Sequence, residues 1–382
     1  MSTPVLPSCA HVDLGAIRDN VAALKAHAGS AEVMAVVKAD AYGHGLLPAA
    51  RAAVRGGATW LGVAQLAEAV ELVQAGITTR VLSWLHVPGQ DFTEAVSLGI
   101  DLGVSATWSL DQVLAAAAST GRTARVHLKV DTGLGRNGAW DADLLALIAA
   151  VGRAQAEGAL ELVGVFSHFA YADAPAHPTV RAQQEQFEAV VAQFEAAGLR
   201  PQVRHLANSA ATLTNPSAHY DLVRPGVAVY GLSPVPDLGA PADFGLREAM
   251  RLVSRLSLVK DCPAGQGVSY GHTYTTASDT RLGLVPMGYS DGIPRHASNA
   301  GPVQVGDRTY TVAGRVCMDQ FVLDLGADST AAAGDEAVLF GVGALGEPTA
   351  QDWAQAAQTI NYEIVTRVGA RVPRVYVEEA HA

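Results

Sequence analysis

The feature that most constrains the fold is an alternation of two kinds of segment between residues 33 and 231. Short apolar runs rich in β-branched residues are typical of buried strands, and segments rich in Ala, Leu, Glu and Gln lie between most of them. The runs are VMAVVKA (33–39), WLGVAQ (60–65), RVLSWL (80–85), LGVS (102–105), ARVHLKVD (124–131), LELVGVFSHF (160–169), VRHLANS (203–209) and LVRPGVAVYG (222–231). Eight strands alternating with helices predict a closed (β/α)8 barrel. An open doubly wound sheet stays possible, because periodicity does not show whether a parallel sheet closes.

The segments between the strands carry helical patterns, of which LAEAVELVQAG (66–76) and TVRAQQEQFEAVVAQFEAAG (179–198) are examples. In the second, six residues recur near one face at amphipathic-helix spacing: Val180, Gln184, Phe187, Val190, Val191 and Phe194. We expect this helix to cover the outside of the barrel.

The pattern changes after a Pro- and Gly-rich stretch, LSPVPDLGAPADFG (232–245). Short alternating runs with turn residues at close intervals follow, which is typical of an all-β domain. One helix, TAQDWAQAAQ (349–358), interrupts them. We therefore predict a barrel domain over residues 1–240 and a β-rich domain over residues 241–382.

Composition excludes several classes of partner. The formal net charge of −11, with no basic block to offset it, argues against nucleic acid and against an anionic membrane surface. The three cysteines are far apart and form no CxxC pair, so we expect neither a disulfide framework nor a metal site. No apolar window is long enough to span a bilayer, and the first residues lack the pattern of a signal peptide. We expect a cytoplasmic protein.

The stretch VVKADAYGHG (36–45) places Lys38 at the end of the first apolar run. A lysine in this position commonly extends its amine to the surface. The alternative is a partly buried lysine whose pKa is lowered, so that the neutral amine attacks a carbonyl carbon. The residues at the other strand ends must decide between the two interpretations.

Two motifs after the fifth run suggest other enzymes. GLGRNG (133–138) matches the GxGxxG pattern of NAD-dependent dehydrogenases, but the acidic candidate for the ribose, Glu161, opens the next run instead of ending it. DTG (131–133) occurs once, whereas aspartic proteases need two carboxylates that share a proton. We rank both interpretations low.

Polar residues follow several of the strands at the end where a barrel carries its chemistry. In chain order they are Lys38 with Tyr42, Lys129 with Arg136, His168, Asn208 with Ser209, and Arg224 with Gly226. Each has an ordinary structural explanation alone. Together they predict a pocket with an anion-binding cradle late in the barrel, where Gly226 permits close approach of the backbone.

These motifs give the chain a specific resemblance. VVKADAYGHG resembles the pyridoxal-phosphate lysine motif of alanine racemases. Further blocks of that family appear in the same order, in KVDTGLGRNG, SHFAYAD, LANSAAT, LVRPGVAVYG, VSYGHTY, GYSDG, GRVCMDQ and NYEIVTR. The resemblance covers the chain from about residue 10 onward, and the one departure noted is Asp40, where the family usually has Asn. The family fold, a (β/α)8 barrel followed by a β-domain, agrees with the pattern above.

The resemblance implies a role for each matching residue. Lys38 holds pyridoxal 5′-phosphate and acts as one catalytic base, and Tyr270 is the second base on the opposite face of Cα. The remaining cofactor-binding residues are Tyr42, His168, Asn208, Ser209, Arg224, Gly226, Val227 and Tyr362. The substrate-binding residues are Arg136, Met318, Asp319 and Tyr289, and Lys129 is an N6-carboxylysine. Tyr289 and Tyr362 also narrow the entrance, together with Asp173, Arg295 and Arg315.

The resemblance further implies that the enzyme interconverts L- and D-alanine and supplies D-alanine for cell-wall peptidoglycan. It implies a head-to-tail homodimer in which each β-domain completes the partner's barrel mouth, since Tyr270 and Lys38 lie in different domains. Three alternatives stay open: a racemase that also accepts serine or other small amino acids, an NAD-dependent dehydrogenase, and a non-catalytic pyridoxal-phosphate carrier.

Overall fold

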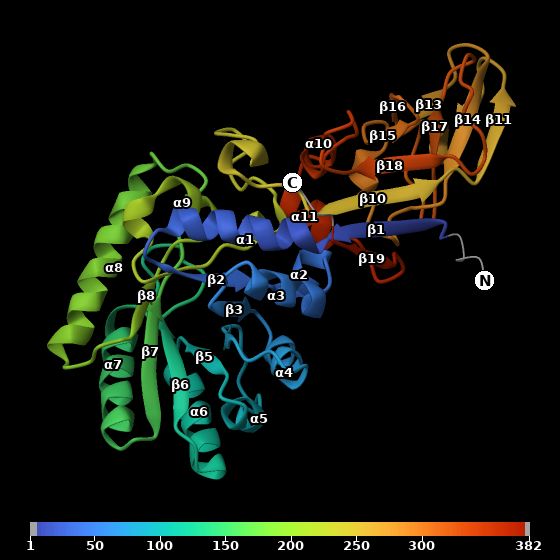
Figure 1. Cartoon of the computed structure of the whole chain (residues 1–382). Coiled ribbons are helices and arrows are strands. Elements are labelled where there is room, and N and C mark those ends of the chain that lie inside the picture. Colours follow the sequence, from blue (N-terminus) through green and yellow to red (C-terminus); the bar gives the residue numbers. More distant parts are fainter. Residues whose placement is uncertain (1–5, 379–382) are drawn as a thin grey trace.

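The computed structural model describes residues 6–378 and contains an eight-stranded sheet whose neighbouring strands are all parallel (Figure 1). All eight predicted runs contribute a strand to this sheet. The strands are β2 (Glu32–Val36), β3 (Trp60–Val63), β4 (Arg80–Ser83), β5 (Asp101–Val104), β6 (Ala124–Lys129), β7 (Leu160–Phe166), β8 (Val203–His205) and β9 (Leu222–Val223). Strands β2 to β8 pair in chain order, and β9 pairs with β2.

The two ends of this sheet meet, so it curves into a barrel. The amide of Asp221 donates to the carbonyl of Arg204 (3.1 Å), and the amide of Arg224 donates to the carbonyl of Ala207 (2.9 Å). These bonds join the β9 segment to the β8 segment. The predicted barrel is confirmed, and the open doubly wound sheet is not formed.

Helices surround the barrel (Figure 1). Along the chain, one helix precedes the first barrel strand and the others lie between successive strands. Their bounds are α1 (Leu14–Ala28), α2 (Lys38–Gly43), α3 (Leu46–Arg55), α4 (Leu66–Gln74), α5 (Thr93–Ser97), α6 (Thr107–Thr120), α7 (Asp141–Ala156), α8 (Pro178–Ala196) and α9 (Ser209–Thr214). The face of α8 that packs on the barrel is close to the predicted one, except that Gln183 is buried and Gln184 is only half-buried. Short 3-10 helices occupy Pro216–Ala218, Val227–Tyr230, Pro241–Phe244, Tyr270–His272 and Arg295–Ala297. Within residues 6–378, no helix combines the length and the apolar character that a bilayer crossing requires.

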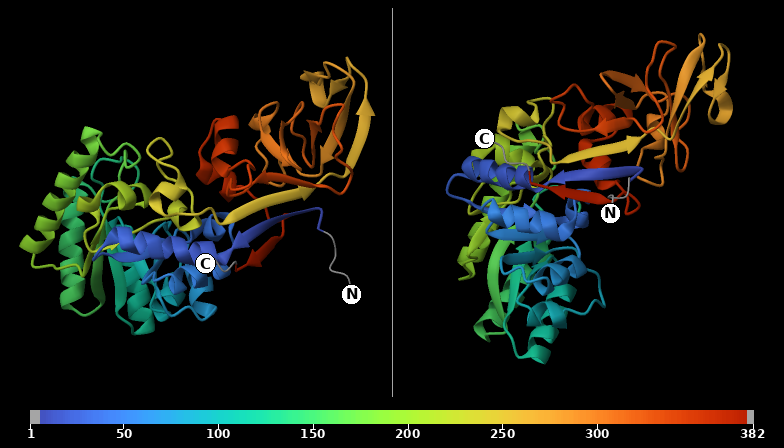
Figure 2. Two further views of the ribbon diagram at one scale, coloured as in Figure 1. Left: turned by 45° about the horizontal axis from the view of Figure 1, so that its top comes forward. Right: turned by 45° about the vertical axis from the view of Figure 1, so that its right-hand side comes forward.

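Residues 250–377 are rich in short strands, as predicted. Its elements are β10 (Met250–Arg255), β11 (Leu258–Cys262), β12 (Gly267–Val268), β13 (Tyr274–Thr275), β14 (Thr280–Val285), β15 (Pro302–Val305), β16 (Arg308–Thr311), β17 (Phe321–Asp324), β18 (Glu336–Phe340), α10 (Ala350–Ala356), α11 (Asn361–Thr366) and β19 (Arg374–Val377). Figure 2 shows this part extending from one end of the barrel.

The first strand of the chain, β1 (Ser8–Asp13), does not belong to the barrel. It pairs antiparallel with β10 and parallel with β19, in a sheet of order β16-β15-β18-β10-β1-β19. The start of the chain therefore adds a strand to the β-rich part. The division at residues 240 and 241 stays a prediction.

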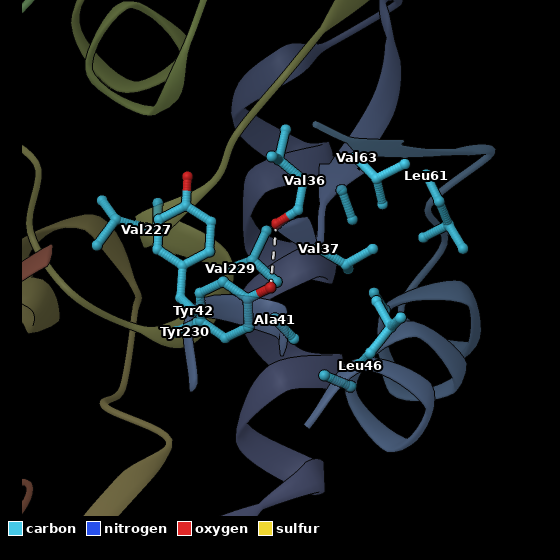
Figure 3. Close-up of a cluster of buried hydrophobic side chains, with 14 of the residues drawn as sticks. Val36, Val37, Ala41, Tyr42, Leu46, Leu61, Val63, Val227, Val229 and Tyr230 are labelled. Atoms are coloured by element: carbon cyan, nitrogen blue, oxygen red, sulfur yellow. Dashed lines mark hydrogen bonds between the residues drawn. The ribbon is translucent and has the colours of Figure 1, made fainter. Parts of the chain in front are cut away.

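A buried apolar cluster packs around the end of β2 (Figure 3). Val36 and Val37, the two residues before Lys38, are buried there beside Tyr42 and Tyr230, whose rings lie 5.0 Å apart. The hydroxyl of Tyr230 donates to the carbonyl of Val36 (3.0 Å). This packing fixes where the lysine leaves the strand.

Candidate active site

A cavity of about 480 Å³ opens at the carboxyl ends of the barrel strands. Eleven of the predicted site residues line it: Lys38, Tyr42, Lys129, Arg136, His168, Asn208, Ser209, Arg224, Gly226, Val227 and Tyr362. Parallel strands bring their carboxyl ends to one rim of a barrel, which explains how Lys38 and Arg224, far apart in the sequence, meet there. Tyr362 reaches the same cavity from α11 (Asn361–Thr366).

Lys38 is the second residue after β2 and is half-buried. Burial lowers the pKa of its amine, and the nearby Arg136 guanidinium lowers it further. The carboxylate of Glu68 acts in the opposite direction. Lys38 lines the cavity and burial dominates its pKa, so the buried-lysine interpretation fits this structure better than the surface one.

Ser209, Gly226 and Tyr42 form a tight group on one wall of the cavity. The hydroxyl oxygen of Ser209 accepts from the amides of Gly226 (2.7 Å) and Ala228 (3.4 Å). A Cβ at Gly226 would lie 2.3 Å from the hydroxyl of Tyr42, so no other residue fits there without displacement. Hydroxyl groups and a backbone that can be approached closely are the features that bind phosphate.

Arg224 lies on the same rim, almost fully buried. Its guanidinium donates to the carbonyls of Ser167 (2.7 Å) and Leu206 (3.3 Å) and contacts Nδ1 of His168 (3.4 Å). Burial lowers the pKa of Arg224 to about 9, so the group stays charged at neutral pH. Arg224 and the other cations at the rim add to burial in holding the pKa of His168 well below its usual value, so His168 is neutral.

A row of buried side chains continues from Arg224 through the inside of the barrel. Nη1 of Arg224 is 3.2 Å from Nδ1 of His205, whose Nε2 is 2.9 Å from Nδ1 of His127. Burial lowers the pKa of His127 to about 3 and that of His205 well below its usual value, so both rings are neutral. A guanidinium only donates, so we assign the ring protons to Nε2 of both histidines. Nε2 of His127 then faces Asp101 at 3.9 Å.

Lys129 ends β6 and is buried near the ring of Phe166, with its Nζ 5.3 Å from the ring centroid. Burial lowers its pKa to about 8, and the charges of Arg224, Arg136 and Lys38 add to the effect. Five lysine and arginine side chains therefore line one cavity, because Arg367 also lies there. This excess of positive charge suits an anionic ligand or an anionic modification.

The GLGRNG motif lies in the loop between β6 and α7 and does not begin a helix. The carboxylate of Asp131 accepts from the amides of Gly133, Leu134 and Gly135, at 2.9 to 3.3 Å. These are the amides that a dinucleotide phosphate would need, and a carboxylate already occupies them. The dehydrogenase interpretation finds no support in this loop.

Four of the predicted residues of the β-rich part do not line the cavity of this chain, whereas Tyr362 of the same part does. Tyr270, Met318 and Tyr289 are 72%, 53% and 40% exposed. Asp319 is also exposed, and its carboxylate accepts from Arg371 (2.7 Å), which with Ser290 lowers the pKa of Asp319. Two tyrosines that the resemblance places at one site, Tyr270 and Tyr362, are thus separated within the chain.

Sequence reasoning missed Trp84, which lines the cavity, and Asp101, His127 and His205 of the buried row inside the barrel. Trp84 lies just beyond β4, at the same rim, and its position at a strand end was the signal that could have identified it. His205 ends β8 and carried the same signal, whereas Asp101 begins β5 and His127 lies within β6, where a polar residue gives no such signal.

The cavity fits pyridoxal phosphate. It holds an amine for the aldehyde, a hydroxyl and amide cradle for the phosphate, and a guanidinium that can only donate a hydrogen bond. The glycine in the cradle has no space for a Cβ, which is what close approach of the backbone to a phosphate group requires.

Comparisons with known proteins agree with the geometry. Residues 12–234 match the model of the alanine racemase N-terminal domain, and residues 249–376 match that of the C-terminal domain. The alanine racemase of Frankia casuarinae is 61% identical over 372 residues, which cover 97% of each chain. That of Streptomyces coelicolor is 58% identical, with 98% of this chain and 97% of the relative covered.

The same family appears among solved structures. The crystal structure of alanine racemase from D-cycloserine-producing Streptomyces lavendulae superposes with a TM-score of 0.97 at 57% identity, and 99% of each chain is covered. The chain belongs to the alanine racemase family, whose members are enzymes that depend on pyridoxal 5′-phosphate.

Proposed function

We propose that this alanine racemase works with two bases, Lys38 of one chain and Tyr270 of a second copy, on opposite faces of the substrate Cα. The observation that carries the proposal is the amine of Lys38, which lies in the cavity with its pKa lowered by burial and by Arg136. A lowered pKa leaves more of the amine neutral at physiological pH, and only the neutral amine attacks an aldehyde or accepts a proton.

The residues that would hold pyridoxal phosphate come from four parts of the barrel rim and from α11. We assign the phosphate to the hydroxyls of Tyr42, Ser209 and Tyr362 and to the backbone at Gly226 and Val227, with Asn208 and His168 completing the wall. The amide of Gly226, which donates to Ser209 in this structure, would have to change its acceptor to the phosphate. When bound, the cofactor makes the hydrogen on the substrate Cα acidic enough to be removed. Arg224 would donate a hydrogen bond to the pyridine nitrogen and, because it keeps its own protons, would leave that nitrogen unprotonated.

We assign the substrate carboxylate to Arg136, next to Lys129. A neutral amine reacts with carbon dioxide, and the pKa of Lys129 is lowered to about 8, so we propose that Lys129 is N6-carboxylysine. The carbamate would replace a repelling cation with an anion that orients Arg136. Intact-mass measurement should find one added carboxyl group that is lost on acid treatment, whereas an unmodified mass in bicarbonate buffer would contradict this assignment.

We propose a head-to-tail homodimer, because Tyr270, Met318, Asp319 and Tyr289 are exposed and lie outside the cavity of their own chain. Mixing two inactive variants tests the arrangement. A Lys38→Ala chain and a Tyr270→Phe chain would together form one intact site per mixed dimer, so re-association should restore about a quarter of the wild-type activity. If each site were completed within one chain, mixing would restore nothing.

Alanine is the substrate of this family, and we propose slower turnover of serine. One extra hydroxyl in a pocket shaped for a methyl group gives limited discrimination, of about 100-fold. Supply of D-alanine for peptidoglycan follows from family membership, and a cytoplasmic location stays a prediction. Loss of optical rotation of L-alanine, compared with L-serine, tests the substrate range. Equal rates would favour the broader racemase over the specific one.

A further inference from the structure

Lys38 is followed by a turn of unusual backbone conformation. Ala39, Asp40, Ala41 and Tyr42 have φ angles between 53° and 55°, which places four successive non-glycine residues in the left-handed region. Residues with a Cβ rarely adopt this region, because Cβ then crowds the following carbonyl oxygen. Contacts from the surrounding structure must therefore hold this segment, which we call the lysine turn (residues 38–43).

Most hydrogen bonds of the lysine turn are local. The amide of Ala41 donates to the carbonyl of Val37 (2.9 Å), and the side chain of Asp40 accepts from the amide of Leu46 (2.7 Å). At the far end of the turn, Arg374 of β19 donates to the carbonyl of Gly43 (2.9 Å). The contacts of Asp40 and Gly43 hold the end of the turn that is distant from Lys38, whereas the bond from Ala41 to Val37 spans Lys38.

Glu68 holds the end that is next to Lys38. One of its oxygens, Oε1, accepts from the amide of Ala39 (2.6 Å). The other, Oε2, accepts from the amides of Ala64 (3.1 Å) and Gln65 (3.0 Å), at the junction of β3 and α4. One carboxylate thus links the first peptide after Lys38 to the neighbouring barrel strand.

The same carboxylate acts on the charge of Lys38. The groups that face the amine are Arg136, Lys129 and His168 across the cavity, and Glu68 beside the turn. Burial and Arg136 lower the pKa of Lys38, and Glu68 raises it. His168 is neutral, so it adds no charge. Glu68 is thus the group that opposes burial and Arg136 in setting the charge of Lys38.

We propose that Glu68 is a positioning residue for Lys38: its carboxylate ties the lysine turn to the end of β3 and so fixes where the amine enters the cavity. The inference rests on the function proposed for Lys38. Glu68 is not among the residues that line the cavity and contacts its wall through the amide of Ala39, so its effect passes through that backbone and through its charge.

Three full-length variants test the inference. Glu68→Ala removes both the acceptor and the charge, Glu68→Gln keeps an acceptor oxygen without the charge, and Glu71→Gln makes the same charge change one turn further along α4. Glu71 is exposed, which makes it the matched control. Three quantities are measured for each variant. They are the hydrogen exchange of the peptide containing Ala39, the affinity for pyridoxal phosphate, and the pH profile of Lys38 acetylation after the cofactor has been removed.

A hydrogen bond to a charged acceptor corresponds to about 10- to 100-fold in an equilibrium constant. We therefore expect E68A to speed exchange at Ala39 and to weaken cofactor binding by at least about tenfold. E68Q should keep more of the exchange protection at Ala39, because it keeps an acceptor oxygen. It should shift the acetylation profile of Lys38 to lower pH, because it removes the negative charge that raises the pKa of the lysine. E71Q should match the wild type in all three measurements.

The inference is overturned if E68A matches E71Q in exchange and affinity, or if E68Q leaves the acetylation profile unchanged. If E68A does not fold, the acetylation profile of E68Q still decides. Failure of the proposed function looks different: borohydride reduction of the wild-type enzyme would then leave no phosphopyridoxyl group on Lys38, whatever the behaviour of the Glu68 variants.

Discussion

Gly226→Ala should damage the phosphate cradle through a single contact. The added Cβ would lie 2.3 Å from the hydroxyl of Tyr42 and 3.0 Å from its Cζ. Carbon and oxygen atoms prefer about 3.5 Å, so the hydroxyl must move by about 1 Å. Tyr42 is 8% exposed and packs 5.0 Å from the ring of Tyr230 and 6.3 Å from that of Tyr362, so it has little room to move.

The cost of such overpacking is about 1–3 kcal/mol, which corresponds to about 5- to 150-fold in an equilibrium constant. We expect the G226A variant to lose that much unfolding free energy without cofactor, and to bind pyridoxal phosphate more weakly because the displaced hydroxyl is assigned to the phosphate. Affinity is measured by titrating the cofactor-free enzyme and following absorbance. Gly152→Ala is the matched control, since its Cβ would lie 3.8 Å from Leu199, an ordinary contact. Affinity in G226A equal to that in G152A would refute the reasoning.

A second substitution tests whether contact with the hydroxyl of Tyr42 causes the destabilisation expected for Gly226→Ala. Tyr42→Phe removes the atom that the new Cβ would meet, so it should restore most of the urea stability that Gly226→Ala costs in the cofactor-free enzyme. Stability is the right measurement here, because the hydroxyl is also assigned to the phosphate. Additive losses in the double variant would show that the strain lies elsewhere.

Three further predictions concern other buried groups. Burial raises the pKa of Glu248 to about 8 from 4.5, so the folded protein holds this proton longer than the unfolded chain. Stability should fall by at most about 5 kcal/mol as pH rises from about 4.5 to about 8, and Glu248→Gln should abolish that fall in urea unfolding; an unchanged slope would contradict this. Asp131→Ala removes the carboxylate that holds the loop carrying Arg136. KM for alanine should therefore rise about tenfold, with a smaller change in kcat. An unchanged KM would contradict the assignment of the substrate carboxylate to Arg136. His205→Leu removes the partner of Arg224 and should cost about 2–4 kcal/mol of unfolding free energy; a cost below about 1 kcal/mol would show that the buried row is not needed.

Much of the barrel followed from the sequence, because buried parallel strands leave uninterrupted apolar runs. The residues at strand ends, such as Lys38 and Arg224, could be predicted for the same reason: once the strands are known, the active rim is known. Pairing of β1 with β10 could not be predicted, since it joins segments some 240 residues apart and strand patterns do not name their partners.

The interior row of Asp101, His127 and His205 also escaped prediction. Asp101 begins β5, His127 lies within β6 and His205 ends β8, and the sequence does not show that the three side chains lie next to one another. Glu68 carried a visible signal of a helix start, because a Glu three residues after the N-cap is typical of a capping box. Its bond to Ala39 depends on two strands being adjacent in the barrel, which only the fold provides.

Reduction with borohydride, followed by peptide mapping, tests the central assignment most directly. The treatment turns a bond between an amine and the aldehyde of the cofactor into a stable one. We expect a phosphopyridoxyl group on Lys38 alone, in the peptide that contains VVKADAYGHG. A modified lysine elsewhere, or none, would contradict the assignment of Lys38 as the residue that binds the cofactor.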